Sequence, residues 1–196
     1  MSKAILFLAG GASQRFDGDK RFVALPSGQN LFERAQGIAE DAGLKALFAV
    51  NASAMQRLAS TSFAAACYEV KSADEGMGAT ISESVAHYAD GFDSLLLCPL
   101  DLPLLQASTI QRVADLASQQ AIVQPECKGR LGHPVAFGAV YFHQLLTLQG
   151  DQGAKAIIQR NADQLVKVMV EDPGIYEDLD TADDYLKLFG QPLPVT

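Results

Sequence analysis

Short apolar segments that end abruptly in polar loops are the feature of this sequence that most restricts its fold. Residues Ala4–Leu8 contain no polar side chain and run directly into a stretch rich in glycine and charge. Ser94–Cys98 is nearly as apolar and leads into a proline-flanked turn that carries Asp101. Such runs are typical of central parallel strands, which are covered on both faces.

Helical patterns alternate with these strands along the chain. Asn30 and Glu33 have the spacing of a capping box, which predicts a helix that ends near Gly43, and Thr181 is placed to cap a last helix. Strands are also expected at 44–50, 65–70, 121–124 and 165–170, and helices around 81–88, 110–116, 139–148, 151–160 and 181–189. This alternation predicts an α/β fold: a doubly wound, mostly parallel sheet with helices on both faces.

The size, charge and cysteine content of the chain narrow the classes of protein. With 196 residues, 48% of them hydrophobic and 19% charged, the sequence is expected to form a single domain over 1–196. A net charge of −8 disfavours a nucleic-acid binder, which normally presents a basic face. Three widely spaced cysteines indicate neither a disulfide framework nor a zinc site. The apolar run from Ala4 is too short for a signal peptide or a membrane span, so we expect a cytoplasmic protein with no membrane contact.

Ligands of doubly wound sheets bind beyond the carboxyl ends of the strands, which directs attention to the loops at 9–20, 72–78 and 99–103. The first loop begins with Gly10 and Gly11, whose backbone N–H groups can approach a phosphate closely, and adds the cations Arg15 and Lys20. It matches neither a Walker A motif nor GxGxxG. This chemistry fits a triphosphate, although a glycine-rich turn with solvated cations has the same composition.

Three aspartates are candidate ligands of a metal ion. Asp101 follows a buried strand in a stiff turn, and Mg²⁺ in proteins is often held by one or two carboxylates together with phosphate oxygens. Asp178 and Asp180 fall on the same side of a segment if it is extended, so either can supply a second ligand. Capping is the competing explanation for each, because Asp is common in turns and at the starts of helices.

A glycine-rich loop at 128–134 carries positive charge, opposite in sign to the charge of the three aspartates. Arg130 and His133 stand there beside flexible backbone and are candidates for binding an acidic acceptor; an exposed basic turn is the alternative. His87 and His143 fall inside helical patterns, so we expect them at the surface or in the core rather than in catalysis.

Taken in order, these segments resemble the molybdenum-cofactor nucleotidyltransferases, the guanylyl- and cytidylyltransferases of molybdopterin. Residues 8–20 read LAGGASQRFDGDK, similar to the family's LAxGxSxRxxxxK loop, and PLDLP around Asp101 resembles its metal-binding turn. Four further segments resemble its cytidylyl branch: EGMG at 75–78, GHP at 132–134, GDQGAK at 150–155 and DLDT at 178–181. The LAGG beginning is instead similar to the guanylyl branch, so the base stays open between CTP and GTP.

The resemblance implies a Rossmann-like fold of the nucleotide-diphospho-sugar transferase type and Mg²⁺-dependent transfer of NMP from an NTP to molybdopterin or another phosphate-bearing acceptor. The acceptor phosphate would attack the α-phosphorus and pyrophosphate would leave, so no general base is required. Arg15, Lys20 and Asp101 would be catalytic, Asp101 with Asp178 or Asp180 would hold Mg²⁺, and a molybdoenzyme would be a protein partner. The residues expected at the nucleotide are Leu8, Ala9, Gly10, Gly11, Ser13, Arg15, Lys20, Gly76 and Gly78.

Two other functions use the same loop chemistry. A sugar-1-phosphate nucleotidyltransferase is the enzymatic alternative, but 196 residues is short for that class and no sugar-binding insert is evident. A nucleotide-binding sensor or cofactor chaperone is the non-catalytic alternative, and the presence of Arg15, Lys20 and Asp101 argues against it.

Overall fold

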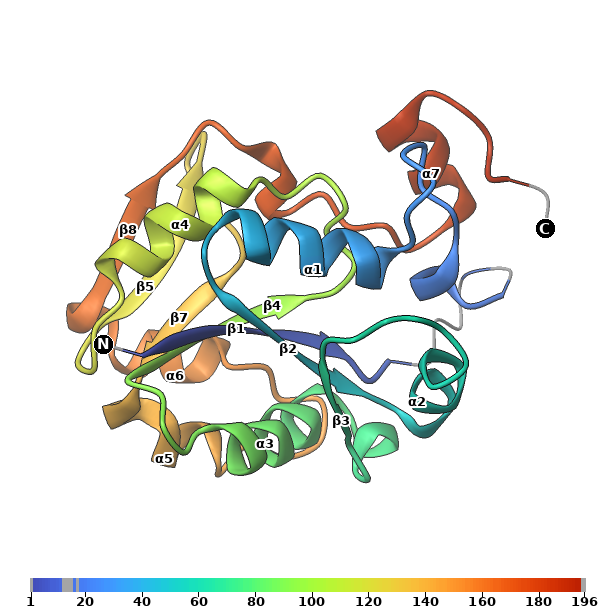
Figure 1. Cartoon of the computed structure of the whole chain (residues 1–196). Coiled ribbons are helices and arrows are strands. Elements are labelled where there is room, and N and C mark those ends of the chain that lie inside the picture. The colour runs from blue at the N-terminus through green and yellow to red at the C-terminus, as the bar shows by residue number, and fades with distance from the viewer. Residues whose placement is uncertain (1, 12–15, 17, 195–196) are drawn as a thin grey trace.

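A mixed β-sheet forms the centre of the molecule. The computed structural model describes residues 2–11, 16 and 18–194, and these build one 8-stranded sheet in the order β3-β2-β1-β4-β7-β5-β6, with β8 paired to β5 (Figure 1). The strands are β1 (Lys3–Ala9), β2 (Lys45–Val50), β3 (Ala66–Glu69), β4 (Ser94–Pro99), β5 (Ile122–Cys127), β6 (Arg130–Leu131), β7 (Val135–Gly138) and β8 (Leu165–Met169).

Pairing directions divide this sheet into two halves. β1 runs parallel to β2 and β4, and β2 runs parallel to β3, whereas β7 is antiparallel to both β4 and β5. β6 is antiparallel to β5, and β8 is parallel to it. The predicted α/β class and mostly parallel sheet are confirmed. The sequence pattern was wrong for part of the loop expected at 128–134, which contains β6, and it missed β7, because four residues are too few to show a period.

Helices cover both faces of the sheet. In Figure 1, α1, α4 and α7 lie on one side, and α3, α5 and α6 lie on the other. The helices are α1 (Leu31–Asp41), α2 (Ala52–Leu58), α3 (Met77–Tyr88), α4 (Ala107–Leu116), α5 (Phe142–Leu145), α6 (Lys155–Arg160) and α7 (Ala182–Phe189). Short 3-10 turns occupy Lys20–Phe22, Ala73–Glu75, Ala139–Tyr141, Ala162–Gln164 and Pro173–Ile175.

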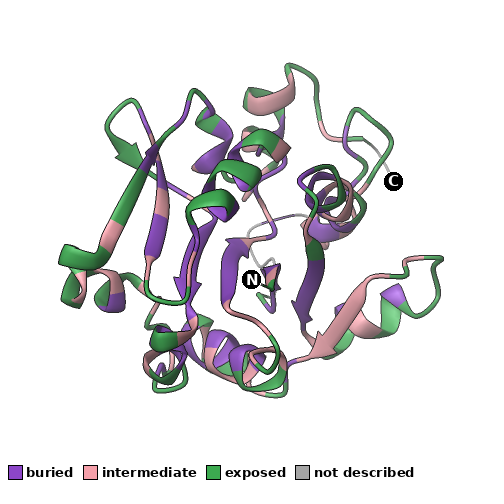
Figure 2. Ribbon diagram, turned by 60° about the vertical axis from the view of Figure 1, so that its left-hand side comes forward, coloured by how far each residue is buried: buried purple, intermediate pink, exposed green. Residues whose placement is uncertain are grey.

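The first strand shows why both faces need a cover. Its side chains alternate, so Ile5 and Phe7 pack into one buried cluster with α1, α2, α4 and α7, while Leu6 and Leu8 pack into another with α3, α5 and α6. Figure 2 shows the buried residues along the strands and on the helix sides that face them. Burying one such large apolar side chain contributes roughly 1.5–3 kcal/mol to stability. Because apolar side chains project from both faces of the strand, each face needs its own layer of helices.

Helix boundaries agree with the sequence where a cap defines them. Asn30 and Glu33 form the predicted capping box of α1, and Thr181 caps α7. α2 was not predicted, because it is short and only two of its side chains, Ala54 and Leu58, are buried. The helices expected at 139–148 and 151–160 are shorter than predicted, since each opens with a turn before α5 and α6 begin.

The order of the strands creates a switch point beside β1. The chain passes from β1 outward to β2 and β3, and then returns to place β4 on the other side of β1. Leu8 pairs with Pro99, so the carboxyl ends of β1 and β4 lie next to each other. The crevice beyond such a switch point is where α/β sheets bind ligands.

Candidate functional site

The glycine loop after β1 is held close to its neighbours. Asn51, the N-cap of α2, donates from Nδ2 to the Gly10 carbonyl oxygen at 3.1 Å. A Cβ on Gly10 would lie 3.1 Å from Thr80 Oγ1 on α3, so a larger residue would push against this helix. Gly10 is therefore confined beside α3, and it lines a cavity together with Gly11, which has open space around it.

A buried guanidinium fixes the far end of this loop. Arg21, only 5% exposed, donates from Nη1 to the Ala9 carbonyl oxygen at 2.7 Å and makes two 2.7 Å hydrogen bonds to the Asp19 carboxylate. Burial opposes the charge on Asp19, but the hydrogen bonds and charge of Arg21 outweigh it and lower the pKa of this carboxyl group. Sequence reasoning missed Arg21, because nothing in its local pattern marks it as buried.

Lys20 lies between Asp19 and Arg21 in the sequence and connects the glycine loop to the segments that carry Asp101 and Asp180. Its Nζ donates to Asp101 Oδ2 at 2.6 Å and to Asp180 Oδ1 at 2.7 Å. The three side chains are only 13%, 25% and 29% exposed. Burial disfavours the ammonium, but the charges of the two carboxylates and the hydrogen bonds to them outweigh it, so the pKa of Lys20 is raised.

The segment that carries Asp178 and Asp180 is tied to the turn after β4. The backbone N–H of Leu179 donates to the Asp101 carbonyl oxygen at 2.9 Å. Asp180 is the one of the two aspartates that reaches Lys20. Burial raises the pKa of Asp178, and the neighbouring charges of Asp101 and Asp180 raise it further. The structure therefore gathers negative charge at this point beside the Lys20 ammonium.

The residues present fit a divalent metal ion. Asp101 and Asp180 already converge on one cation, the Lys20 ammonium, at distances of 2.6 and 2.7 Å. Within the described ranges, no group of three or more His, Cys, Asp or Glu side chains is placed to hold a metal. Mg²⁺ does not need such a cage, because one or two carboxylates commonly hold it together with phosphate oxygens and water.

A cavity of about 320 Å³ adjoins the glycine loop. Its lining combines Leu8, Gly10 and Gly11 with Gly76 and other residues of the segment that leads into α3. Gly76 has a φ of +116°, which favours glycine, and packs against the backbone of Gly150.

Gly78 does not line this cavity. It packs against the loop at 149–152, where a Cβ would lie 2.5 Å from the Gln152 carbonyl oxygen. Close packing therefore explains this glycine, and a contact with nucleotide stays a prediction.

Glu83 of α3 holds the loop that borders the 320 Å³ cavity. Its carboxylate accepts hydrogen bonds from the Tyr68 hydroxyl, from the backbone N–H groups of Lys71 and Ser72, and from the Ser72 hydroxyl. Burial opposes ionisation, but these hydrogen bonds dominate and lower the pKa of Glu83 to about 2.

A second cavity, of about 640 Å³, shares Leu8 and Met77 with the first. His133 lines it. Burial lowers the pKa of His133 despite opposing effects of the Leu97 backbone and the Asp101 charge, so the imidazole is neutral at pH 7. Its Nδ1 is buried without a partner among the residues that the structure describes. Arg130 is not part of the lining and instead stacks over the Tyr176 ring at 4.2 Å.

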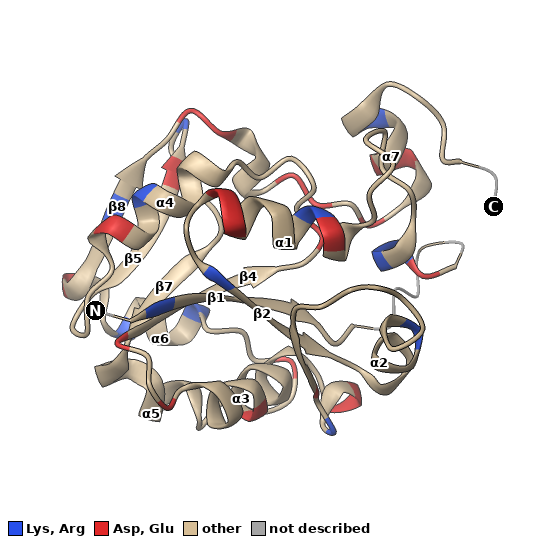
Figure 3. Cartoon of the chain, viewed as in Figure 1, with Lys and Arg blue, Asp and Glu red and all other residues tan. Residues whose placement is uncertain are grey.

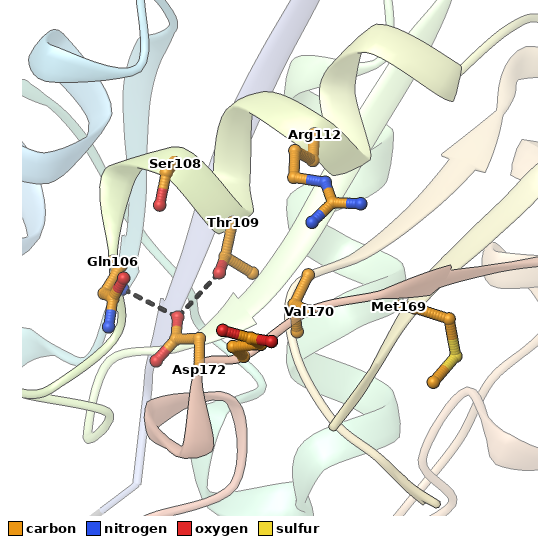
Figure 4. A pocket seen from close by; sticks show the side chains of 8 residues that line it. Gln106, Ser108, Thr109, Arg112, Met169, Val170 and Asp172 are labelled. Carbon is orange, nitrogen blue, oxygen red and sulfur yellow. Dashed lines mark hydrogen bonds between the residues drawn. The ribbon is translucent and has the colours of Figure 1, made fainter. Parts of the chain in front are cut away.

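A third hollow, of about 500 Å³, lies between α4 and the end of β8 and shares no lining residue with the other two (Figure 4). Its buried carboxylate, Asp172, accepts hydrogen bonds from the Gln106 backbone, the Thr109 hydroxyl and the Gly174 backbone. Asp172 thus fixes the turn before Tyr176, and the Ile175 carbonyl in that turn accepts the His133 N–H at 2.8 Å. This side chain positions site residues from a distance.

Other predictions concern the surface and the residues outside the described part of the chain. Acidic and basic side chains are interspersed over the elements seen in Figure 3. His87 and His143 are exposed, as expected. Ser13 and Arg15 lie outside the described residues, so their predicted roles stay predictions. No helix in the described ranges has the length and apolar character needed to span a membrane.

Comparison with known proteins identifies the family. The family model of the MobA-like NTP transferase domain matches residues 5–165. The chain belongs to this family. Among curated proteins no sequence matches significantly. The membership of the chain among MobA-like NTP transferases confirms the predicted resemblance and supports a nucleotidyl-transferring enzyme, in a family that uses a divalent metal.

Solved structures agree on the fold. Rv0371c from Mycobacterium tuberculosis is 21% identical with a TM-score of 0.84, covering 97% of this chain and 99% of that one. Its complex with manganese is 20% identical with a TM-score of 0.80, covering 97% of this chain and 100% of that one. A nucleotidyl transferase from Methanothermobacter thermautotroptrophicus is 18% identical with a TM-score of 0.82, covering 96% of each chain. Molybdopterin-guanine dinucleotide biosynthesis protein A from Archaeoglobus fulgidus is 17% identical with a TM-score of 0.65, covering 96% of this chain and 97% of that one. The Rossmann-like, nucleotide-diphospho-sugar transferase type of fold is thereby confirmed.

Proposed function

We propose that this MobA-like NTP transferase moves NMP from CTP or GTP to a phosphate-bearing acceptor of the molybdopterin kind and releases pyrophosphate. The observation that carries the proposal is the contact of Lys20 with Asp101 and Asp180, at the switch point where the glycine loop borders a cavity. Three motifs separated in the sequence thereby supply backbone donors, a cation and paired carboxylates at one place. Backbone donors, cations and a carboxylate-bound metal ion are groups that stabilise the charge that develops during transfer of a phosphate group.

Each group has a distinct role in the proposed reaction. The backbone N–H groups of Gly10 and Gly11 bind phosphate oxygens, and Leu8 and Gly76 enclose the nucleoside side of the cavity. Lys20 neutralises negative charge on the triphosphate, and Arg15 and Ser13 act with it in the same loop. The acceptor phosphate is ionised at neutral pH, so alignment and charge neutralisation are sufficient for the transfer and no general base is required.

The metal proposed for this site is Mg²⁺. Asp101 and Asp180 would hold it, and Asp178 lies in the same acidic group. When bound, Mg²⁺ would supply positive charge beside the phosphates. The manganese complex of Rv0371c supports a divalent ion in this fold and leaves its identity open.

Several finer assignments belong to the same proposal. Arg130 and His133 are proposed to serve the acceptor side, a molybdoenzyme is the proposed protein partner, and the cytoplasm is the proposed location. Three free cysteines suit that reducing compartment. One sheet that includes all the described strands supports a single nucleotidyltransferase domain over 1–196.

Pyrophosphate release tests the proposal directly. CTP, GTP, ATP and UTP are each supplied with Mg²⁺ and either molybdopterin or glucose 1-phosphate. We expect pyrophosphate with CTP or GTP and molybdopterin. Release only with glucose 1-phosphate would favour the sugar-1-phosphate alternative, and nucleotide binding without release under any acceptor would favour the non-catalytic one.

A further inference from the structure

The 640 Å³ cavity has the size of a small-molecule site and a lining of unusual composition for a phosphorylated metabolite. Sites for such ligands commonly span roughly 300–1,000 Å³. Its floor is built from apolar residues of the sheet, including Leu97, Val135 and Phe137, and its walls from Ile81 of α3 and Ile158 of α6. It therefore offers a mostly apolar enclosure directly beside the nucleotide cavity.

Polar and charged side chains are a minority of this lining and comprise Gln124, His133, Lys155 and Gln159. The Gln124 side chain already donates from Nε2 to the Gly132 carbonyl oxygen at 3.1 Å. The Nδ1 atom of His133 is buried without a partner among the described residues, and the side chain of Gln159 is exposed. Lys155 is the one Lys, Arg, Asp or Glu among the described residues of the lining, and its side chain is exposed at the start of α6.

The excess of apolar over polar side chains in the lining favours some classes of acceptor over others. A sugar carries a hydroxyl group on almost every carbon, and each hydroxyl that leaves water without a partner is destabilised. An aromatic or otherwise apolar body loses little on entering such a cavity. A negatively charged phosphate on that body would be attracted to the single lysine.

We propose that the 640 Å³ cavity is the acceptor compartment and selects a phosphate monoester carried on a flat or elongated, mainly apolar body, whose negative charge is bound by Lys155. The position of the cavity supports this, because Leu8 and Pro99 line it at the carboxyl ends of β1 and β4, next to the turn of Asp101. The identification of this cavity as the acceptor site rests on the proposed function, whereas the class of ligand rests on the lining of the cavity itself. Lys155 is thus a specificity-determining residue for the acceptor.

Direct binding to the full-length protein without nucleotide tests the ligand class. The probe is 1-naphthyl phosphate, followed by its fluorescence and by calorimetry. We expect saturable binding that a tenfold excess of glucose 1-phosphate does not displace. Displacement by glucose 1-phosphate at equal concentration, or absence of saturable binding, would overturn the proposal.

Two substitutions locate the bound probe. Lys155→Met is expected to weaken its binding roughly tenfold, the effect of one hydrogen bond to a charged group. Leu131→Gln, at a 37% exposed position of the rim, is expected to weaken it roughly threefold through lost apolar contact. Lys45→Met is the matched control, because Lys45 is exposed at the opposite, amino-terminal end of β2. Wild-type affinity in Lys155→Met, or an equal loss in Lys45→Met, would contradict the role of Lys155.

Pyrophosphate release separates failure of this inference from failure of the proposed function. A protein that binds 1-naphthyl phosphate through Lys155 but releases no pyrophosphate with any NTP would refute the transferase and retain the compartment. A protein that transfers NMP to glucose 1-phosphate and does not bind the probe would retain the transferase and refute the compartment.

Discussion

Replacement of Lys20 by methionine is expected to strengthen metal binding to the nucleotide-free protein while weakening the use of nucleotide. The two effects have opposite signs because one ammonium serves both. A divalent ion that binds Asp101 and Asp180 must first displace Lys20 Nζ from contacts of 2.6 and 2.7 Å. Methionine is of similar length and removes the Lys20 ammonium from its contacts with both carboxylates.

The size of the effect follows from those contacts. A hydrogen bond to a charged group contributes about 1.5–3 kcal/mol. All three side chains retain some exposure, from 13% to 29%, so screening by solvent reduces each contact to about 1 kcal/mol or less. Removing one to two such contacts corresponds to roughly a tenfold fall in the Kd for the metal, since 1.4 kcal/mol is a factor of about ten.

Electron paramagnetic resonance of free Mn²⁺ during a titration measures this Kd without catalysis. Lys71→Met is the control for loss of one positive charge, because the Lys71 side chain is 74% exposed and pairs only with Glu69 among the described residues. With nucleotide, Lys20→Met is expected to lose roughly 2–4 kcal/mol of transition-state stabilisation in kcat/KM. An unchanged or raised Kd for Mn²⁺ in Lys20→Met would refute the competition between lysine and metal.

Three further substitutions test other parts of the site. Asp101→Asn should abolish most pyrophosphate release with an unchanged thermal midpoint, and wild-type turnover would exclude the metal role. Glu83→Gln should raise the KM for nucleotide and lower the free energy of unfolding by about 1 kcal/mol at pH 7. Because the pKa of Glu83 falls from 4.5 to about 2 on folding, that difference is complete above pH 4.5 and should vanish in denaturant titrations as the pH falls toward 2; a constant difference would contradict it. Asp172→Ala should leave buried donors unpaired, which should lower the free energy of unfolding by about 2–4 kcal/mol and lower the thermal midpoint. A midpoint equal to wild type would show that water replaces the carboxylate.

The arrangement of the candidate site was largely predictable because a topological rule connects the motifs. Lys20 is 81 residues from Asp101 and 160 from Asp180, a separation that no local pattern spans. Each residue nevertheless follows a strand or precedes a helix in the predicted order, and parallel strands bring their carboxyl ends to one edge. The sequence could not choose between Asp178 and Asp180, since alternation places both on one side. The hydrogen bond from the Leu179 N–H to the Asp101 carbonyl oxygen, which helps to orient the segment, leaves no pattern in the sequence.

Other features depended on contacts that leave no local pattern. Arg21 reads as a surface cation beside Lys20, but its partners, Asp19 and the Ala9 carbonyl, make it part of the interior. Asp172 reads as an ordinary turn residue, although it is 2% exposed. The two cavities also depend on the exact approach of α3 and α6, which periodicity does not determine. Burial of polar side chains with distant partners is therefore what limited the sequence analysis.

The antiparallel strand β7 separates the sheet into two parts. On one side of it, the parallel ladder of β1, β2 and β4 holds the glycine loop and Asp101. On the other side, β5, β6 and β8 contribute Gln124, Leu131 and Leu165 to the larger cavity. We expect side-chain substitutions in this second part to leave the hydrogen-bond register of β1, β2 and β4 unchanged. Under the proposed function, we expect a sheet divided in this way to allow the acceptor to change during evolution while the NTP stays the same.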